Sequence, residues 1–214
     1  MKIIPIIITF FFVFESCSKE KTKSEIEKEH IKNDAKDNAI HDSISISSKE
    51  DIQKYYSEFQ NELEKKDLDS TVLDYECDGK DGRIIYYSKN NKLKIIRHEY
   101  SEYSHYSAVE KFYLNNEKPF FIFRDESVWS FDGGTPEKPE TKDNITESRM
   151  YFVNGKIIDC LEKKYILKSA EKEKPDPSKF SSRQSKDCKS EEMLSELAKF
   201  IRHKNAKATL KNCL

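Results

Sequence analysis

The amino-acid sequence predicts an α+β fold: an antiparallel β-meander of about six or seven strands, with an N-terminal and a C-terminal helix packed on it. Three strand–turn–strand patterns follow one another in the middle of the chain. One amphipathic helical pattern precedes them and another follows them. Only 36% of the residues are hydrophobic and 36% are charged, so part of the chain is expected not to fold.

Length and charge exclude several classes of protein. The 214 residues suffice for one domain with tails, and 38 basic residues face 39 acidic ones. A general nucleic-acid binder needs a basic excess to neutralise phosphates, so no nucleic-acid partner is expected. The sequence has no GxSxG, P-loop or GxGxxG motif, and no cofactor is expected.

The N-terminal residues predict where the protein is directed. Lys2 precedes an apolar run from Ile3 to Phe14, which is shorter than the roughly 20 residues of a transmembrane helix. The run ends at Ser16-Cys17 and resembles a bacterial lipobox, where the cysteine is acylated after cleavage before it. This resemblance implies a signal peptide over residues 1–16 and a lipid anchor on Cys17 that holds the chain in a bilayer. Ser18 after the cysteine favours the outer membrane, and the alternative is a secretory signal cleaved elsewhere.

The mature chain divides into three parts. Residues 17–47 hold the lipidated cysteine and a charged, Ser-rich stretch without aromatic residues. Such a stretch buries too little apolar area to offset the entropy of ordering, so it is interpreted as a tether. Residues 48–204 form the predicted α+β domain, and residues 205–214 form a C-terminal tail.

Two segments have helical periodicity. In the first, from Ser48 to Lys66, Ser48 and Asp51 form a weak capping-box pattern. Its apolar face comprises Ile52, Tyr55, Tyr56, Phe59 and Leu63. In the second, from Ser190 to His203, Ser190 is the expected N-cap. Its apolar stripe comprises Met193, Leu194, Leu197, Ala198 and Ile201.

The segment between the helices has a β pattern that recurs three times. Each repeat is an aromatic-rich strand, a turn containing Asn, and a second apolar strand; the turns are Asn90-Asn91, Asn115-Asn116 and Asn154-Gly155. Asn and Gly tolerate the positive φ that tight hairpin turns require. Residues Thr71 to Cys77 supply one further strand. The helices are expected to cover the apolar face of the resulting sheet.

Part of this pattern resembles a family of uncharacterised Bacteroidota lipoproteins. The similar segments are Glu110 to Leu114, Pro119 to Arg124, and Glu147 to Ile158, which contains Asn154-Gly155-Lys156. This chain departs from the family at Asp159-Cys160, where a Trp is usual. The resemblance implies a fold and an envelope location, and it brings no activity with it.

Four cysteines remain after Cys17. In an exported chain an even number predicts disulfides, and four cysteines allow three connectivities. The pairs Cys77–Cys160 and Cys188–Cys213 are preferred, with Cys160–Cys188 nearly as plausible.

The run from His98 to His105 contains residue types that bind metals. If Ser101-Glu102 turns a hairpin, His98 and His105 become cross-strand neighbours about 5 Å apart. With Glu99 or Glu102 they would then form a divalent-metal site of a small hydrolase. The simpler interpretation, which is preferred, is a solvated hairpin tip.

Residues Asp125 to Thr146 are interpreted as a long loop between strands. It carries Trp129, Phe131 and Asp132, and loops of that length are often functional. Exposed aromatic side chains favour a protein or glycan partner. The competing interpretation, preferred slightly, places Trp129 and Phe131 in the core.

These observations favour a non-enzymatic binding or inhibitor module on the envelope. A small metal-dependent hydrolase at the His98–His105 hairpin is one alternative. An immunity or envelope-structure lipoprotein with one protein partner is another.

Overall fold

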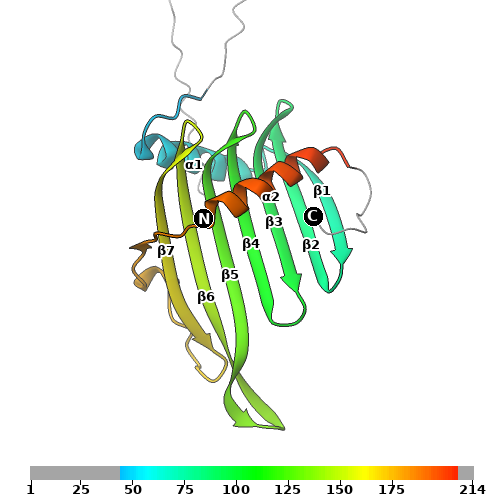
Figure 1. Ribbon diagram of the computed structural model, residues 1–214, viewed down its shortest axis with the longest axis vertical. Coiled ribbons are helices and arrows are strands. Elements are labelled where there is room, and N and C mark those ends of the chain that lie inside the picture. Colours follow the sequence, from blue (N-terminus) through cyan, green and yellow to red (C-terminus); the bar gives the residue numbers. More distant parts are fainter. Residues whose placement is uncertain (1–43, 207–214) are drawn as a thin grey trace, which may run out of the picture. The chain divides into compact units, whose positions relative to one another are not determined.

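The computed structural model describes residues 44–206, which form one eight-stranded antiparallel sheet and two α-helices (Figure 1). Each strand pairs with the next along the chain, so the sheet is a meander in the order β1 to β8. The elements are α1 Lys49–Glu64, β1 Asp69–Cys77, β2 Lys80–Lys89, β3 Lys92–Glu102, β4 Tyr106–Asn115, β5 Lys118–Thr135, β6 Lys138–Val153, β7 Lys156–Lys168, the short 3₁₀ helix η1 Pro177–Lys179, β8 Arg183–Gln184 and α2 Ser190–His203. The α+β meander is confirmed, with eight strands instead of six or seven.

The three predicted hairpins are present as β2–β3, β4–β5 and β6–β7. Two consecutive residues with positive φ connect each pair of strands, at Asn90-Asn91, Asn116-Glu117 and Asn154-Gly155. Two positive φ angles match the twist of the flanking strands, which explains the preference for Asn and Gly there. The second turn lies one residue later than predicted, because Asn115 still pairs with Lys118.

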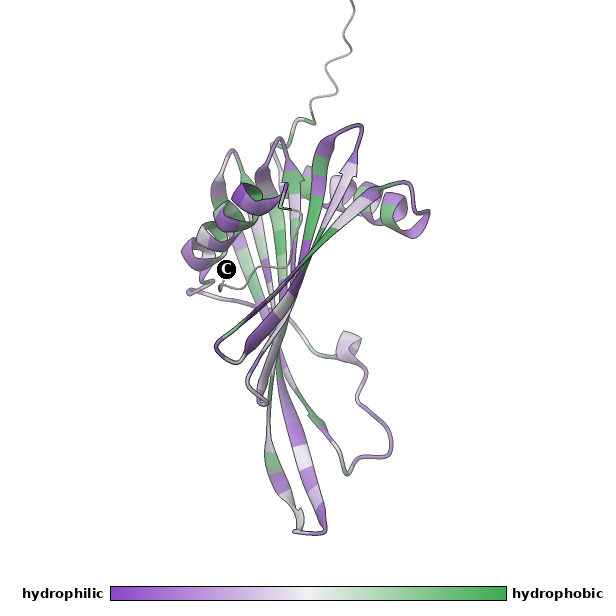
Figure 2. Ribbon diagram, turned by 90° about the vertical axis from the view of Figure 1, so that its right-hand side faces the viewer, coloured by the Kyte–Doolittle hydropathy of each residue, from purple (hydrophilic) through white to green (hydrophobic). Residues whose placement is uncertain are grey.

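The two helices lie on opposite faces of the sheet, as Figure 2 shows from the side. The face under α2 buries residues such as Ile96 and Phe112, and the face under α1 buries their chain neighbours Ile95 and Tyr113. Successive side chains of a strand point to opposite faces, so a run of apolar residues is buried on both. The expectation of a single apolar face is therefore wrong.

The helix starts follow different rules. α1 begins as predicted, since Ser48 accepts a hydrogen bond from the Asp51 backbone and the Asp51 side chain bonds back to Ser48. α2 has no side-chain cap. Its N-cap is Lys189 in the left-handed region, and Ser190 is already the first helical residue.

Candidate functional site

The predicted metal ligands do not converge. β3 continues to Glu102 and β4 begins at Tyr106, so the turn lies between them and His98 pairs with Glu110 instead of His105. His98 is buried, His105 is exposed at the turn, and Glu102 forms an ion pair with Lys80 at 3.2 Å. The hypothesis of a metal site at this hairpin is wrong because the turn is displaced from Ser101-Glu102. Within residues 44–206, no group of three His, Cys, Asp or Glu side chains is placed to hold a metal ion.

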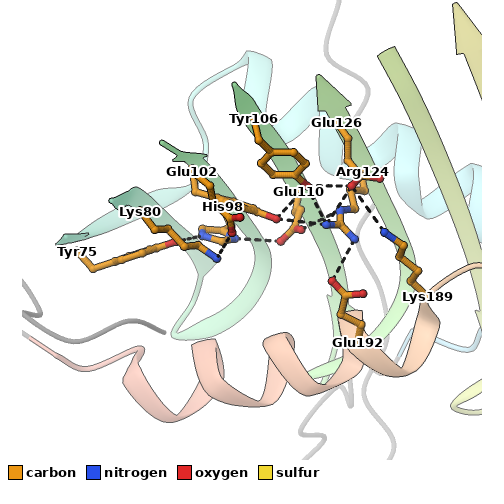
Figure 3. Close-up of polar contacts among 11 residues, drawn as sticks. Tyr75, Lys80, His98, Glu102, Tyr106, Glu110, Arg124, Glu126, Lys189 and Glu192 are labelled. Atoms are coloured by element: carbon orange, nitrogen blue, oxygen red, sulfur yellow. Dashed lines mark hydrogen bonds and ion pairs between the residues drawn. The ribbon is translucent and has the colours of Figure 1, made fainter. Parts of the chain in front are cut away.

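His98 belongs instead to a buried polar network beneath α2 (Figure 3). His98, Glu110 and Arg124 are direct cross-strand neighbours on β3, β4 and β5. His98 Nδ1 lies 2.9 Å from Glu110 Oε2, and Arg124 Nε lies 3.2 Å from Glu110 Oε1. The second contact is an ion pair without hydrogen-bond geometry. One row of the sheet thus places a base, an acid and a permanent cation side by side.

Tyrosines extend this network on both sides. The Tyr75 hydroxyl lies 2.8 Å from His98 Nε2, and the Tyr100 ring stacks on the His98 ring at 4.6 Å. Arg124 donates to the Tyr106 hydroxyl at 3.0 Å, and that hydroxyl donates to Glu126 at 2.9 Å. Each strand therefore contributes a partner to the next.

α2 covers the side of the network that faces away from the sheet. Its Glu192 carboxylate lies 3.5 Å from Arg124, and Lys189 lies 4.0 Å from Glu126 (Figure 3). The Phe200 ring packs on His98 with centroids 4.6 Å apart. The helix therefore docks through charge pairs at its N-terminal end and through aromatic contact further along.

Burial shifts the protonation of this network. Desolvation lowers the pKa of His98 to about 3, so its ring is neutral near pH 7. Desolvation also raises the pKa of Glu110. Burial, followed by the nearby Glu110 charge, raises the pKa of Glu196 on α2 to about 7. The pKa of Glu196 therefore lies near neutral pH.

The Tyr75–His98–Glu110 chain has the order of a hydroxyl, a base and an orienting acid, as in nucleophilic catalysis. The exposed fractions of the three residues are 2%, 1% and 0%. A nucleophile must meet its substrate, and these side chains are covered by the Tyr100 ring and by α2. We therefore assign the network to the docking of α2. The sequence holds a signal for it, because strand alternation places Glu110 with Phe112 and Arg124 with Ile122 on the inward face.

The predicted long loop is instead an extended hairpin. β5 and β6 stay paired to Thr135 and Lys138, beyond the last partners of their neighbours, Val128 on the β4 side and Lys142 on the β7 side. The loop prediction is wrong because Gly133-Gly134 does not end β5. Both glycines adopt positive φ, and the pairing passes them through an irregularity next to Phe131.

The aromatic residues of this hairpin are neither core nor fully free. Trp129 is half-buried, stacks on His105 with ring centroids 4.2 Å apart and donates Nε1–H to the Ser104 carbonyl. Phe131 is 65% exposed and meets the Trp129 ring edge-on at 5.5 Å. Asp132 bridges Lys142 at 3.0 Å and Lys168 at 2.9 Å, and these cations lower its pKa.

The disulfide found is the alternative pairing. Cys160 bonds Cys188 with an S–S distance of 2.09 Å, so the preferred pairs Cys77–Cys160 and Cys188–Cys213 are wrong. Cys77 is also disulfide-bonded, and Cys213 lies outside the described residues. The Cys160–Cys188 bond ties β7 to the segment that leads into α2. The pairing follows from the chain path, because β8 pairs with β7 and Ser185 bonds to Cys160, which brings the segment before α2 beside β7.

Cys17, the predicted signal peptide and the predicted tether up to residue 43 lie outside the described residues, as does the predicted tail from residue 207. Among residues 44–206, no helix has the length and apolar character needed to span a membrane. A search of family models, of curated proteins and of solved structures finds no match for the chain. The hairpin and the charged surfaces must therefore be interpreted from their own geometry.

Proposed function

We propose that this protein is a non-enzymatic binding module that acylated Cys17 anchors to the outer membrane. In this proposal the β5–β6 hairpin meets a protein or glycan partner. The observation that supports it is the position of the hairpin relative to the point where the chain enters the domain. Ile44 accepts a hydrogen bond from Asn115 beside the β4–β5 turn, and the Thr135–Lys138 turn lies at the opposite end of the same strands (Figure 1).

The chain enters the described domain at Ile44, so the hairpin lies at the opposite end of the strands from the point where the proposed tether would join. The backbones of Trp129 and Thr141 still bond to His105 and Ser169, and beyond them the hairpin has no neighbouring strand in the described part of the chain, so its outer edges are accessible. Phe131 offers an exposed ring, and Trp129 supports it from the side. Rigid aromatic side chains of this kind contribute most of the energy in many interfaces.

Two exposed aliphatic side chains lie on the other face of the same ribbon, opposite Trp129 and Phe131. Val128 and Ile166 are each 45% exposed and lie on either side of Asn144 in one cross-strand row. Apolar side chains on a projecting ribbon favour a protein partner over a polysaccharide, because sugars present fewer apolar faces. An immunity or envelope-structure lipoprotein with one protein partner would use the same surface.

The test is site-specific photocrosslinking in intact cells that express the full acylated chain. A photoreactive residue at Phe131 should give one discrete adduct. A matched probe at Lys156, an exposed residue on the turn at the other end of the sheet, should not give that adduct. Identical products from the two positions, or none from Phe131, would contradict the proposal.

The anchor needs its own test. Labelled palmitate should enter the wild-type chain and should not enter Cys17→Ala, and the variant should leave the membrane fraction. Incorporation of the label into Cys17→Ala would show that the lipid is attached elsewhere or that the anchor is wrongly assigned.

A further inference from the structure

The face of the sheet that α1 only partly covers carries three cations in one cross-strand row. Arg97, Lys111 and Arg149 lie on β3, β4 and β6, and Phe123 on β5 pairs with both Lys111 and Arg149. The ammonium of Lys111 lies 5.9 Å from the centre of the Phe123 ring, and the Arg149 guanidinium lies 5.5 Å from it. The Phe123 ring thus lies between the Lys111 ammonium and the Arg149 guanidinium.

The next row toward α1 is aromatic. Tyr113, Phe121 and Tyr151 are neighbours on β4, β5 and β6, and Tyr56 of α1 packs across them. The Tyr56 ring lies 5.0 Å from the Tyr113 ring and 5.3 Å from the Phe121 ring. These rings line a pocket of about 450 Å³ together with Ile52, Lys111, Phe123 and Arg149, whereas Arg97 lies outside its lining. The pocket therefore has an apolar side under α1 and a cationic side beyond the helix.

The three cations of this cross-strand row differ in how they are paired. Arg97 and Arg149 lie 2.5 and 2.6 Å from Glu99 and Glu147 of the following row. Lys111 makes no hydrogen bond and no ion pair with any residue in the described part of the chain. Burial, followed by the nearby Arg97 charge, lowers the pKa of Lys111.

The remaining lining residues are uncharged. α1 contributes Gln53 and Ser57 at the mouth, and the described lining includes no Asp or Glu side chain. The lining carries two cations, of which Arg149 is paired with Glu147, while Lys111 has only the more distant charges of Asp125 and Glu99 to compensate it. An unpaired, half-buried ammonium is stabilised by an anion that reaches it.

We propose that this pocket binds a small organic anion with an aromatic body. A carboxylate or phosphate oxygen pairs with Lys111 and Arg149, and the body of the ligand packs among Tyr56, Phe121 and Tyr151. The volume lies within the range of small-molecule sites. Aromatic rings favour edge-on and offset contact with a flat ligand. The site is independent of the hairpin and of its partner.

The test is a ligand-observed NMR titration of the full acylated chain in nanodiscs, with empty nanodiscs as the blank. Phenyl phosphate and phenylacetate are the probes. 2-Phenylethanol keeps the ring without charge, and inorganic phosphate keeps the charge without a ring. We expect at least one aromatic anion to bind about tenfold or more tightly than either control, since a charge-assisted contact contributes on this scale. The two probes distinguish phosphate from carboxylate recognition.

Variants locate the binding. Lys111→Met keeps the aliphatic stem and should weaken the preferred anion about tenfold, and Lys111→Arg should retain most of the affinity. Ser57→Trp, at the exposed mouth, should block the pocket without changing its floor. The matched control, Lys156→Met, removes an exposed lysine that does not line the pocket and should change nothing.

Three outcomes would overturn the proposal. One is equal binding of charged and neutral probes. Another is an affinity that changes less than about twofold in both Lys111→Met and Ser57→Trp. The third is an equal loss in Lys156→Met, which would indicate adsorption to surface charge. If Lys111→Met fails to fold, Ser57→Trp decides alone.

Discussion

The two faces of the sheet hold charge in opposite ways. On the face under α2, Glu110 and Arg124 are 0% and 4% exposed, and each lies against oppositely charged or hydrogen-bonding partners. On the face under α1, the row Arg97, Lys111 and Arg149 lies beyond the helix and stays partly exposed. The same cross-strand geometry produces both rows.

The difference teaches where an unmatched charge is permitted. Under a covering helix, a lone charge loses its hydration without compensation, so the covered row must be complementary within itself. On the open side, water hydrates Lys111, and complementarity can be left to a ligand. The covered face therefore determines stability, and the open face is available for function.

The largest expected loss of stability comes from a substitution in the buried charged row under α2. Arg124→Met should lower the free energy of unfolding by about 3–5 kcal/mol, because it leaves buried Glu110 without its cation. The matched control is Arg97→Met on the face under α1. It should cost less than about 1 kcal/mol, since water can hydrate the partner Glu99 once the guanidinium is gone. Denaturant unfolding followed by circular dichroism measures both. Equal losses would show that the two rows are not energetically different.

The sequence predicts the fold well because local signals dominate it. Asn-centred turns and the Ser48–Asp51 capping box are short-range features, and the structure contains both. The opposite placement of the helices was missed, although adjacent apolar residues such as Ile95 and Ile96 indicate a strand buried on both faces. The hairpin was missed because Gly133-Gly134 looks like a strand end but accommodates an irregularity in the pairing.

The second prediction concerns the covalent bond that holds α2 on its face. Cys188→Ser opens the bond to Cys160, which spans a sequence separation of 28, and should cost about 3 kcal/mol by loop entropy. Unfolding measured with and without reductant gives the test. The difference between the two proteins should vanish under reductant, which opens the Cys77 bond in both. A difference that persists would point to packing of the thiol instead.

The candidate sites were less predictable than the fold. His98 was singled out for its residue type, yet its role depends on Glu110 and Arg124, which only the register brings beside it. The pocket likewise depends on register, because Lys111, Phe123 and Arg149 lie on three strands. Sequence periodicity assigns a residue to a face, but a shift in the pairing of two strands changes which residues meet.

The third prediction uses pH to weaken the covered face. The pKa of Glu196 is raised from 4.5 to about 7, so between these values the folded chain binds more protons than the unfolded chain. The stabilisation from Glu196 is therefore complete below about pH 4.5 and is lost as the pH rises through about 7. Glu196→Gln removes this dependence.

The measurement is the difference in free energy of unfolding between wild type and Glu196→Gln across this pH range. Wild type should lose stability relative to the variant as the pH rises. His98, with its pKa lowered to about 3, contributes the opposite slope, and because the Glu196 charge acts on His98, the difference between the two proteins reports on Glu196 together with the groups it contacts. Glu191→Gln, on the exposed first turn of α2, should show no such trend. If the difference in free energy of unfolding between wild type and Glu196→Gln does not change with pH, Glu196 does not contribute to the pH dependence.

The smallest expected effect concerns the β5–β6 hairpin, which neither helix covers. Trp129 on β5 stacks on His105 in the β3–β4 turn, so a double-mutant cycle of Trp129→Ala and His105→Ala should give a coupling of about 0.5–1.5 kcal/mol. A core tryptophan would instead cost about 3–5 kcal/mol by itself. Trp129 is the sole Trp of the chain, so its fluorescence reports on this position alone. We expect partial quenching by iodide, as suits a half-buried ring, and His105→Ala should increase it by uncovering one face. Emission that iodide leaves unchanged in both proteins would place the ring in the core and remove it from the binding surface.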